Sequence, residues 1–181
     1  MNDHELMGTQ GEGSAGSEQY LTFMLAGEEY GVEILQVQEI KGWDSATHIP
    51  NTPAYVRGVI NLRGTIVPVI DLRQRFGLDT IEYSRTTVVI VLKIEDGGRD
   101  RVSGIIVDAV SDVYNVSEEQ RQPAPDFGGQ AAGDFVKGLA TVGDKIVILL
   151  ETSELIRGAI TADELAGATS VAASGAEARA I

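Results

Sequence analysis

Short apolar runs rich in β-branched and aromatic residues recur between residues 20 and 150, and most of them are separated by turns that contain glycine. Runs of this kind, bounded by turn residues, are typical of β-strands. The runs 20–25 and 30–34 flank the turn at 26–29 and predict a hairpin. The sequence Leu35-Gln36-Val37 predicts one helical turn after it. The remaining predicted strands are 38–40, 56–61, 65–70, 86–94, 102–110, 134–142 and 145–150.

Three of these runs are apolar at consecutive positions instead of alternate ones: 88–92, 104–107 and 145–150. Successive side chains of a strand point to opposite faces, so these strands need apolar cover on both sides. In an antiparallel protein, two small barrels that pack against each other provide such cover. The many short strands and few helices predict an all-β protein built of small barrels or a sandwich.

Two short helices are predicted beside the strands. Near 71–77, Asp71 can cap the first turn, Leu72 and Phe76 lie one turn apart on the same face, and Gly77 can end the helix. Near 152–157, Thr152 or Ser153 can cap a second one.

Both ends of the chain differ from this pattern. Residues 1–17 are rich in Gly, Ser and Glu, and residues 159–181 are dominated by Ala, Gly and Ser. Neither stretch can bury enough apolar surface to offset the entropy of ordering it. We therefore expect a flexible N-terminal tail and a flexible or weakly helical C-terminal tail.

The formal net charge is −13, and the chain contains no cysteine. Such a charge repels phosphate backbones and anionic lipid surfaces, which disfavours nucleic acid and direct membrane binding. The absence of cysteine excludes disulfides and thiolate metal sites and fits a reducing compartment. No apolar run approaches the length of a membrane span, and no secretory signal is recognisable, so the expected location is the cytoplasm.

Candidate catalytic groups are sparse. His4 lies in the N-terminal tail and His48 stands alone, so no metal site is predicted. No nucleotide-binding loop or nucleophile motif is present, and no cofactor is expected. Asp108 and Asp112 can be interpreted as paired carboxylates, but four residues of extended chain separate them widely. We interpret them as solvated aspartates at a strand end.

Four arginines, Arg57, Arg63, Arg73 and Arg75, form a local basic cluster. Small barrels that bind single-stranded nucleic acid need a basic groove and stacking aromatics. Aromatic residues make up only 6% of this chain. On an acidic protein, a local basic cluster fits an acidic protein partner better.

The most informative segment is 57–77, Arg-Gly-Val-Ile-Asn-Leu-Arg-Gly-Thr-Ile-Val-Pro-Val-Ile-Asp-Leu-Arg-Gln-Arg-Phe-Gly. Read alone, its Arg63 is an exposed turn arginine. The segment closely resembles the CheW-like family, and further matches occur at 30–32, 37–40, 49–53, 104–108 and 110–113. The resemblance covers about residues 18–158. The turn at 95–100 is somewhat long for the family.

The resemblance implies a fold and partners. CheW-like domains consist of two small five-stranded SH3-like β-barrels around a shared core. They occur as regulatory domains of the histidine kinase CheA, in CheV beside a receiver domain, and as free-standing adaptors. Because 181 residues leave no room for a kinase core or a receiver, we expect the free-standing form. The implied partners are the cytoplasmic tip of methyl-accepting chemoreceptors, the regulatory domain of CheA, and other CheW-like domains in array rings.

The resemblance also assigns residues by position. Arg63 would lie at the groove that receives the receptor tip, and Glu39 and Arg57 would lie on the kinase-binding surface. The implied apolar lining of the groove is Val37, Val88, Gly104 and Val110. Read alone, the valines are ordinary core residues, Gly104 permits close strand packing, and Glu39 is a solvated strand residue.

The implied function is a non-catalytic chemotaxis adaptor that couples receptors to the kinase at receptor arrays, with membrane contact only through the receptors. Two alternatives remain: an adaptor of a non-flagellar chemosensory pathway, and a single-strand nucleic-acid-binding barrel.

Overall fold

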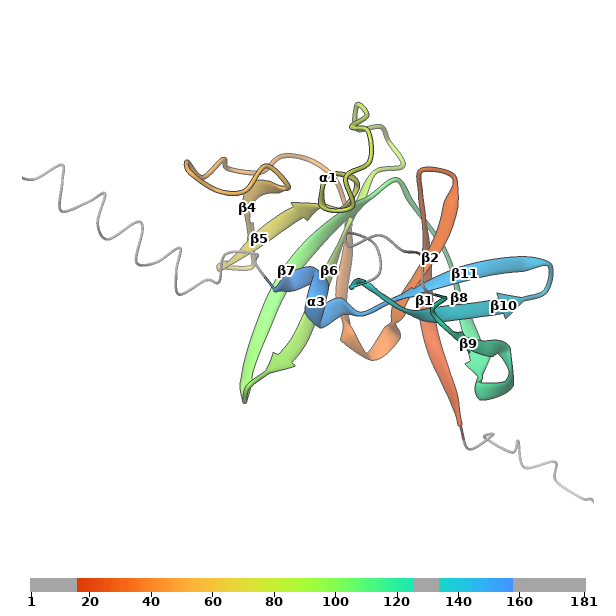
Figure 1. The fold of residues 1–181 in the computed structure, drawn as a ribbon. Coiled ribbons are helices and arrows are strands. Elements are labelled where there is room, and N and C mark those ends of the chain that lie inside the picture. Colours follow the sequence, from red (N-terminus) through yellow and green to blue (C-terminus); the bar gives the residue numbers. More distant parts are fainter. Residues whose placement is uncertain (1–15, 126–133, 158–181) are drawn as a thin grey trace, which may run out of the picture.

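The computed structural model describes residues 16–125 and 134–157, and two β-sheets make up most of it (Figure 1). The predicted all-β class is confirmed. The predicted tails lie almost entirely outside the described residues. In the described part of the chain, no helix is long and apolar enough to cross a membrane.

One sheet has five strands, in the order β3-β6-β7-β5-β4. Its neighbours are antiparallel except for β5 and β7, which are parallel. Thr47, which follows β3, exchanges two backbone hydrogen bonds with Val59 of β4, of 2.8 and 2.9 Å. The two edges of the sheet therefore approach each other, and the sheet curls. The strands are β3 (Val37–Gly42), β4 (Val56–Leu62), β5 (Thr65–Asp71), β6 (Val88–Asp96) and β7 (Arg99–Val107).

The other sheet has six strands, in the order β8-β1-β2-β11-β10-β9. Its sixth strand, β9, is three residues long and pairs with 138–140 of β10. Strand β9 was not predicted, because a three-residue run that contains a proline has no strand pattern. Pro123 is tolerated there because β9 is an edge strand. The strands are β1 (Ser17–Leu25), β2 (Glu28–Glu33), β8 (Ala109–Ser117), β9 (Arg121–Pro123), β10 (Val136–Val142) and β11 (Lys145–Leu150).

The chain passes from one sheet to the other and back. Strands β1 and β2 belong to the six-stranded sheet, β3 to β7 form the whole five-stranded sheet, and β8 to β11 return to the first. The 3-10 turn η1 (Ile34–Gln36) makes the first crossing and Asp108 the second. The sheets are therefore not two independent segments of sequence.

The prediction of one strand over 102–110 is wrong, because the chain changes sheets at Asp108. The backbone N–H of Asp108 donates to the carbonyl of Met24, at 3.1 Å, instead of continuing the β7 ladder. Strand β8, which follows, was missed because its apolar residues neither alternate with polar ones nor form a continuous run.

Buried side chains form three clusters that explain the two-sided apolar strands. Along β6, Val89 and Val91 enter a cluster enclosed by the five-stranded sheet, whereas Ile90 and Leu92 enter a central cluster shared with the other sheet. Along β11, Val147 and Leu149 belong to a third cluster, and Leu150 joins the central one. The prediction that these strands are covered on both faces is confirmed.

The two short helices are present. Helix α1 (Leu72–Arg75) is capped by Asp71, whose Oδ1 accepts the N–H of Gln74 at 3.3 Å, and Gly77 follows with a φ of 72°. Helix α3 (Thr152–Ile156) is not capped as predicted. Thr152 is its buried first residue, and its hydroxyl instead donates to the side chain of Gln36 in η1.

Gly104 is a point of close packing between β5, β6 and β7. A Cβ atom at this position would lie 2.7 Å from Cγ1 of Val89. We expect Gly104→Ala to destabilise the fold by about 1–3 kcal/mol, as overpacking of a core does. The matched control is Gly42→Ala in β3, where a Cβ atom meets nothing within 4 Å. Urea unfolding of both variants measures the difference, and equal stabilities would contradict the packing role of Gly104.

Candidate partner-binding surfaces

The four arginines of the basic cluster do not form one free patch, because each has its own partner. Arg73 makes a two-pronged ion pair with Asp108, with Nε–Oδ1 at 2.9 Å and Nη2–Oδ2 at 2.6 Å. Its Nη1 also donates to the carbonyl of Asp79 at 3.1 Å. The interpretation of Asp108 as a solvated aspartate is therefore wrong. The Asp108 carboxylate also accepts the backbone N–H of Ala26, at 2.9 Å.

Arg75 links α1 to the C-terminal part of the fold. Its guanidinium lies between the rings of Tyr55 and Phe135, 4.5 and 4.7 Å from their centroids. It also donates to the carbonyl of Arg157, at 3.0 Å. Two positions of one helix, with Gln74 between them, thus attach it to both sheets. Arg73 reaches the crossing from β7 to β8, and Arg75 reaches the segments around β10 and α3.

Arg63 lies in the turn between β4 and β5. Arg63 and Gly64 have φ angles of 52° and 87°, as the central pair of a tight hairpin turn requires. The side-chain oxygen of Asn61 accepts the N–H of Gly64 at 2.8 Å and fixes the turn. The Arg63 side chain is 81% exposed. The turn therefore presents a guanidinium to solvent on a well-defined backbone.

The Arg63 guanidinium reaches Glu39 of β3, with Nη2 3.5 Å from Oε2. The structure thus brings together two residues that sequence analysis assigned to different partners. Glu39 is 25% exposed, so it is not simply a solvated strand residue. An exposed ion pair of this kind contributes about 0.2–1 kcal/mol, and a stronger partner can replace it.

Val37, Val88 and Val110 are each half-buried against the central cluster. Val37 pairs with Leu92 and Val88 with Gly42, at opposite ends of the β3–β6 ladder. Four residues of strand separate these ends, about 13 Å. Val110 pairs with Phe23 in the other sheet. The three valines therefore lie around the junction of the sheets and do not form one row. Gly104 is buried beneath it and is not on the surface.

Leu35 in η1 is a candidate that sequence analysis missed. It is 94% exposed, whereas its neighbour Ile34 packs against the central cluster. Leu35 and Ile34 border a cleft of about 520 Å³ that also includes Glu18 and Glu33. A single-turn helix has only one buried face, so one of two adjacent apolar residues must face solvent. Two adjacent apolar residues in a single helical turn are therefore the sequence feature that could have identified Leu35 as an exposed apolar residue.

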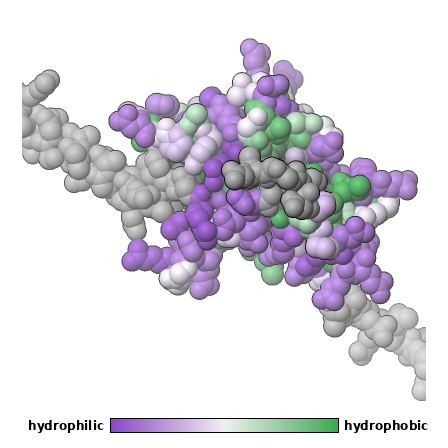
Figure 2. Space-filling model, in the orientation of Figure 1, coloured by the Kyte–Doolittle hydropathy of each residue, from purple (hydrophilic) through white to green (hydrophobic). Residues whose placement is uncertain are grey.

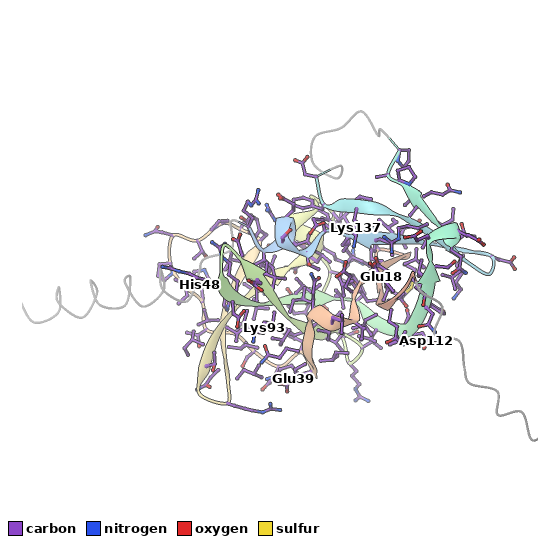
Figure 3. The ribbon with its side chains drawn as sticks, turned by 90° about the horizontal axis from the view of Figure 1, so that it is seen from below. Glu18, Glu39, His48, Lys93, Asp112 and Lys137 are labelled. Atoms are coloured by element: carbon purple, nitrogen blue, oxygen red, sulfur yellow. The ribbon has the colours of Figure 1, made fainter. Side chains whose placement is uncertain are left out.

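Charged groups of four strands, β1, β2, β9 and β10, meet beside this cleft. Arg121 Nη2 lies 2.7 Å from Glu18 Oε2, and Lys137 forms an ion pair with Glu33. The buried Tyr20 hydroxyl donates to Glu18 at 2.7 Å and lowers the pKa of that carboxyl. In Figure 3, Glu18 and Lys137 lie in the six-stranded half, away from Glu39 in the five-stranded half. The two acidic side chains at this cleft thus already have cationic partners.

A second, apolar cleft of about 370 Å³ lies between α1 and the β10–β11 hairpin. Ile146 at its edge is 62% exposed. Figure 2 shows hydrophobic residues gathered on this side of a mostly hydrophilic surface. The cleft is lined by Tyr30, Phe76, Leu78, Val136, Leu139, Ile146 and Ile148.

Among the described residues, no three His, Asp or Glu side chains come together as a metal site would require. His48 is exposed in the segment between β3 and β4.

Comparison with known proteins matches the chain to one family. A family model described as the CheW-like domain matches residues 19–159. The chemotaxis protein CheW of Klebsiella aerogenes is 43% identical over 162 residues, which are 90% of this chain and 93% of that protein. The chemotaxis protein CheW of Rhizobium meliloti is 38% identical over 136 residues, 75% of this chain and 85% of that protein. The crystal structure of the scaffolding protein TtCheW from Thermoanaerobacter tengcongensis superposes with a TM-score of 0.67 at 38% identity, covering 74% of this chain and 88% of that one.

The Arg73–Asp108 pair predicts a pH dependence of stability. The hydrogen bonds from Arg73 hold the pKa of the Asp108 carboxyl below its ordinary value of 3.8. The stabilisation is therefore complete above pH 3.8 and is lost as the pH falls through the lower folded-state pKa. We expect Asp108→Asn to cost about 1–3 kcal/mol at pH 7, and less at a pH below the folded-state pKa.

Denaturant unfolding at neutral and at acidic pH measures this difference. The matched control is Asp112→Asn in the following strand, since Asp112 is exposed and its carboxylate accepts only the N–H of Val113, at 2.8 Å, among the described bonds. It should change stability little at either pH. A cost for Asp108→Asn that does not vary with pH would contradict the ion-pair explanation.

Proposed function

The chain belongs to the family of CheW-like domains, and from this membership we propose that it is a chemotaxis adaptor that couples chemoreceptors to a histidine kinase. The observation that carries the proposal is the 43% identity to a chemotaxis protein CheW over 90% of the chain. A coupling adaptor works by binding, without turnover. It holds two partners in a fixed relation, so that a movement of one changes the conformational equilibrium of the other.

Such a role requires a body that does not deform between its two binding surfaces. The central cluster is shared by both sheets and includes Phe23 and Leu150 of one and Ile90 and Ile105 of the other, all at most 2% exposed. Close-packed interiors of this kind transmit displacement instead of absorbing it. The ion pair and carbonyl contacts of α1 add polar links across the same junction.

The receptor-binding surface that we propose lies around the junction of the sheets. It includes Val37, Val88 and Val110, the exposed Leu35, and Arg63 at its edge. The cytoplasmic tip of a receptor would place apolar side chains against the valines and carboxylates or carbonyls against the guanidinium. Gly104 acts from beneath, by allowing the close approach of Val89.

The kinase-binding surface that we propose lies on the five-stranded sheet and includes Glu39 and Arg57, which would meet the regulatory domain of CheA. Because Glu39 pairs with Arg63, the two surfaces adjoin at this ion pair. Other CheW-like domains would join in rings through related contacts. The adaptor would act in the cytoplasm at receptor arrays and reach the membrane only through the receptors.

The function is tested by titrating the purified chain with a receptor signalling fragment and, separately, with the kinase's regulatory domain. We expect saturable binding of each, and a complex of all three when they are mixed. Failure to bind either partner would contradict the proposed function.

Arg63→Ala tests the receptor surface. We expect receptor affinity to fall by about 1.5–3 kcal/mol, the scale of a charge-assisted hydrogen bond. The thermal midpoint should hardly change, because the side chain is 81% exposed. The matched control is Arg157→Ala, another exposed arginine with one carboxylate partner, Glu154 at 3.0 Å. Loss of kinase binding with receptor binding intact would instead assign Arg63 to the kinase surface.

A further inference from the structure

An aromatic pair closes one side of the five-stranded sheet beside Arg57. The ring of Tyr83, in the segment between α1 and β6, meets the ring of Trp43 edge-on at 4.9 Å between centroids. Both side chains pack against the buried cluster that this sheet encloses, which includes Val67 and Val69. The guanidinium of Arg57 lies over the Tyr83 ring, 5.3 Å from its centroid. Tyr83 therefore touches both the buried cluster and an exposed arginine.

The hydroxyl of Tyr83 is anchored to Asp71, with OH–Oδ2 at 2.5 Å. Asp71 is only 4% exposed, and its other oxygen caps α1 through the N–H of Gln74. Its own N–H donates to the carbonyl of Tyr55, at 2.8 Å. The acceptor is thus fixed by three bonds. Burial, together with the bond to Asp71, raises the pKa of the Tyr83 hydroxyl, so it remains a donor at neutral pH.

The segment that carries Tyr83 has two further attachments. The carbonyl of Thr87 accepts the N–H of Trp43 at 3.0 Å, and the Thr87 hydroxyl accepts the N–H of Ser84 at 2.9 Å. The Arg73 guanidinium holds the carbonyl of Asp79 at the start of the segment. The backbone is therefore tied at both ends, and the hydroxyl bond to Asp71 sets the position of the ring between them.

We propose that Tyr83 is a positioning residue for kinase binding: anchored by Asp71, it holds the guanidinium of Arg57 in the orientation that meets a carboxylate of the kinase's regulatory domain. This inference rests on the proposed function. An exposed arginine has many rotamers, and fixing them on binding costs affinity. A cation–π contact that selects one orientation in the free protein reduces that cost.

The test is a double-mutant cycle between Tyr83 and Arg57, read as affinity for the kinase's regulatory domain. Tyr83→Phe keeps the ring and loses the bond to Asp71, and Tyr83→Leu also loses the ring. We expect the affinity to fall about threefold and about tenfold respectively, the range of one modest hydrogen bond or cation–π contact. In an Arg57→Ala background, neither change should lower the affinity further. A residue that merely stabilises the fold would lower it in both backgrounds.

Two more measurements accompany the cycle. Trp43 is the only tryptophan of the chain, so its emission reports the Tyr83 ring directly, and it should shift in Tyr83→Leu. Tyr114→Phe is the matched control, since the Tyr114 ring packs against the third cluster in the six-stranded sheet, whereas Arg57 lies in the five-stranded one. The affinity of this variant should equal that of the wild type. Equal losses in both backgrounds, or no loss in Tyr83→Phe and Tyr83→Leu, would overturn this inference alone. A wild-type chain that does not bind the kinase domain would overturn the proposed function, and this inference with it.

Discussion

Strands that are apolar on both faces impose the central constraint on this fold. Each face of β6 and β11 needs apolar side chains packed against it. A single sheet with one face exposed to water covers only one of the two faces. The solution is a layered one: each sheet encloses a small cluster of its own, and both share the central cluster. Neither sheet can keep its apolar outer face without the other. The two halves therefore fold as one body.

The chain path strengthens this dependence. Because β3 to β7 are inserted between β2 and β8, two crossings connect the sheets, and polar contacts fix both. At the first, Gln36 of η1 accepts the hydroxyl of Thr152 in α3. At the second, Asp108 accepts Arg73 and the N–H of Ala26. Asp71 at the end of β5 caps the four-residue helix α1, which supplies Arg73 and Arg75. This short stretch therefore connects the five-stranded sheet to the β7–β8 crossing and to the end of α3.

The sequence predicts the β1–β2 hairpin, the two-sided strands and the cap of α1 because these depend on neighbours in the chain. Asp71 can be recognised as a cap from its place before Leu72, and Gly77 as a stop. Contacts between distant residues were not predictable in the same way. Nothing near Asp108 in the sequence indicates Arg73, 35 residues away. Strand β8 is held by its pairing with β1, and its own sequence lacks a strand pattern.

At the candidate site, too, the sequence predicts the local features and not the contacts between distant residues. A tight turn at Arg63 follows from the glycine beside it, but its ion pair with Glu39 depends on how the β4–β5 turn meets β3. That pair is exposed and weak on the usual scale, and it joins residues proposed for the two different partners. The partly buried Arg73–Asp108 pair beside α1, by contrast, lies in the junction between the sheets. Ligand binding can therefore exchange contacts at the surface pair while the junction keeps its geometry. An adaptor needs both an exchangeable surface contact and a rigid junction. The movement of one partner reaches the other partner only through a part of the molecule that does not deform.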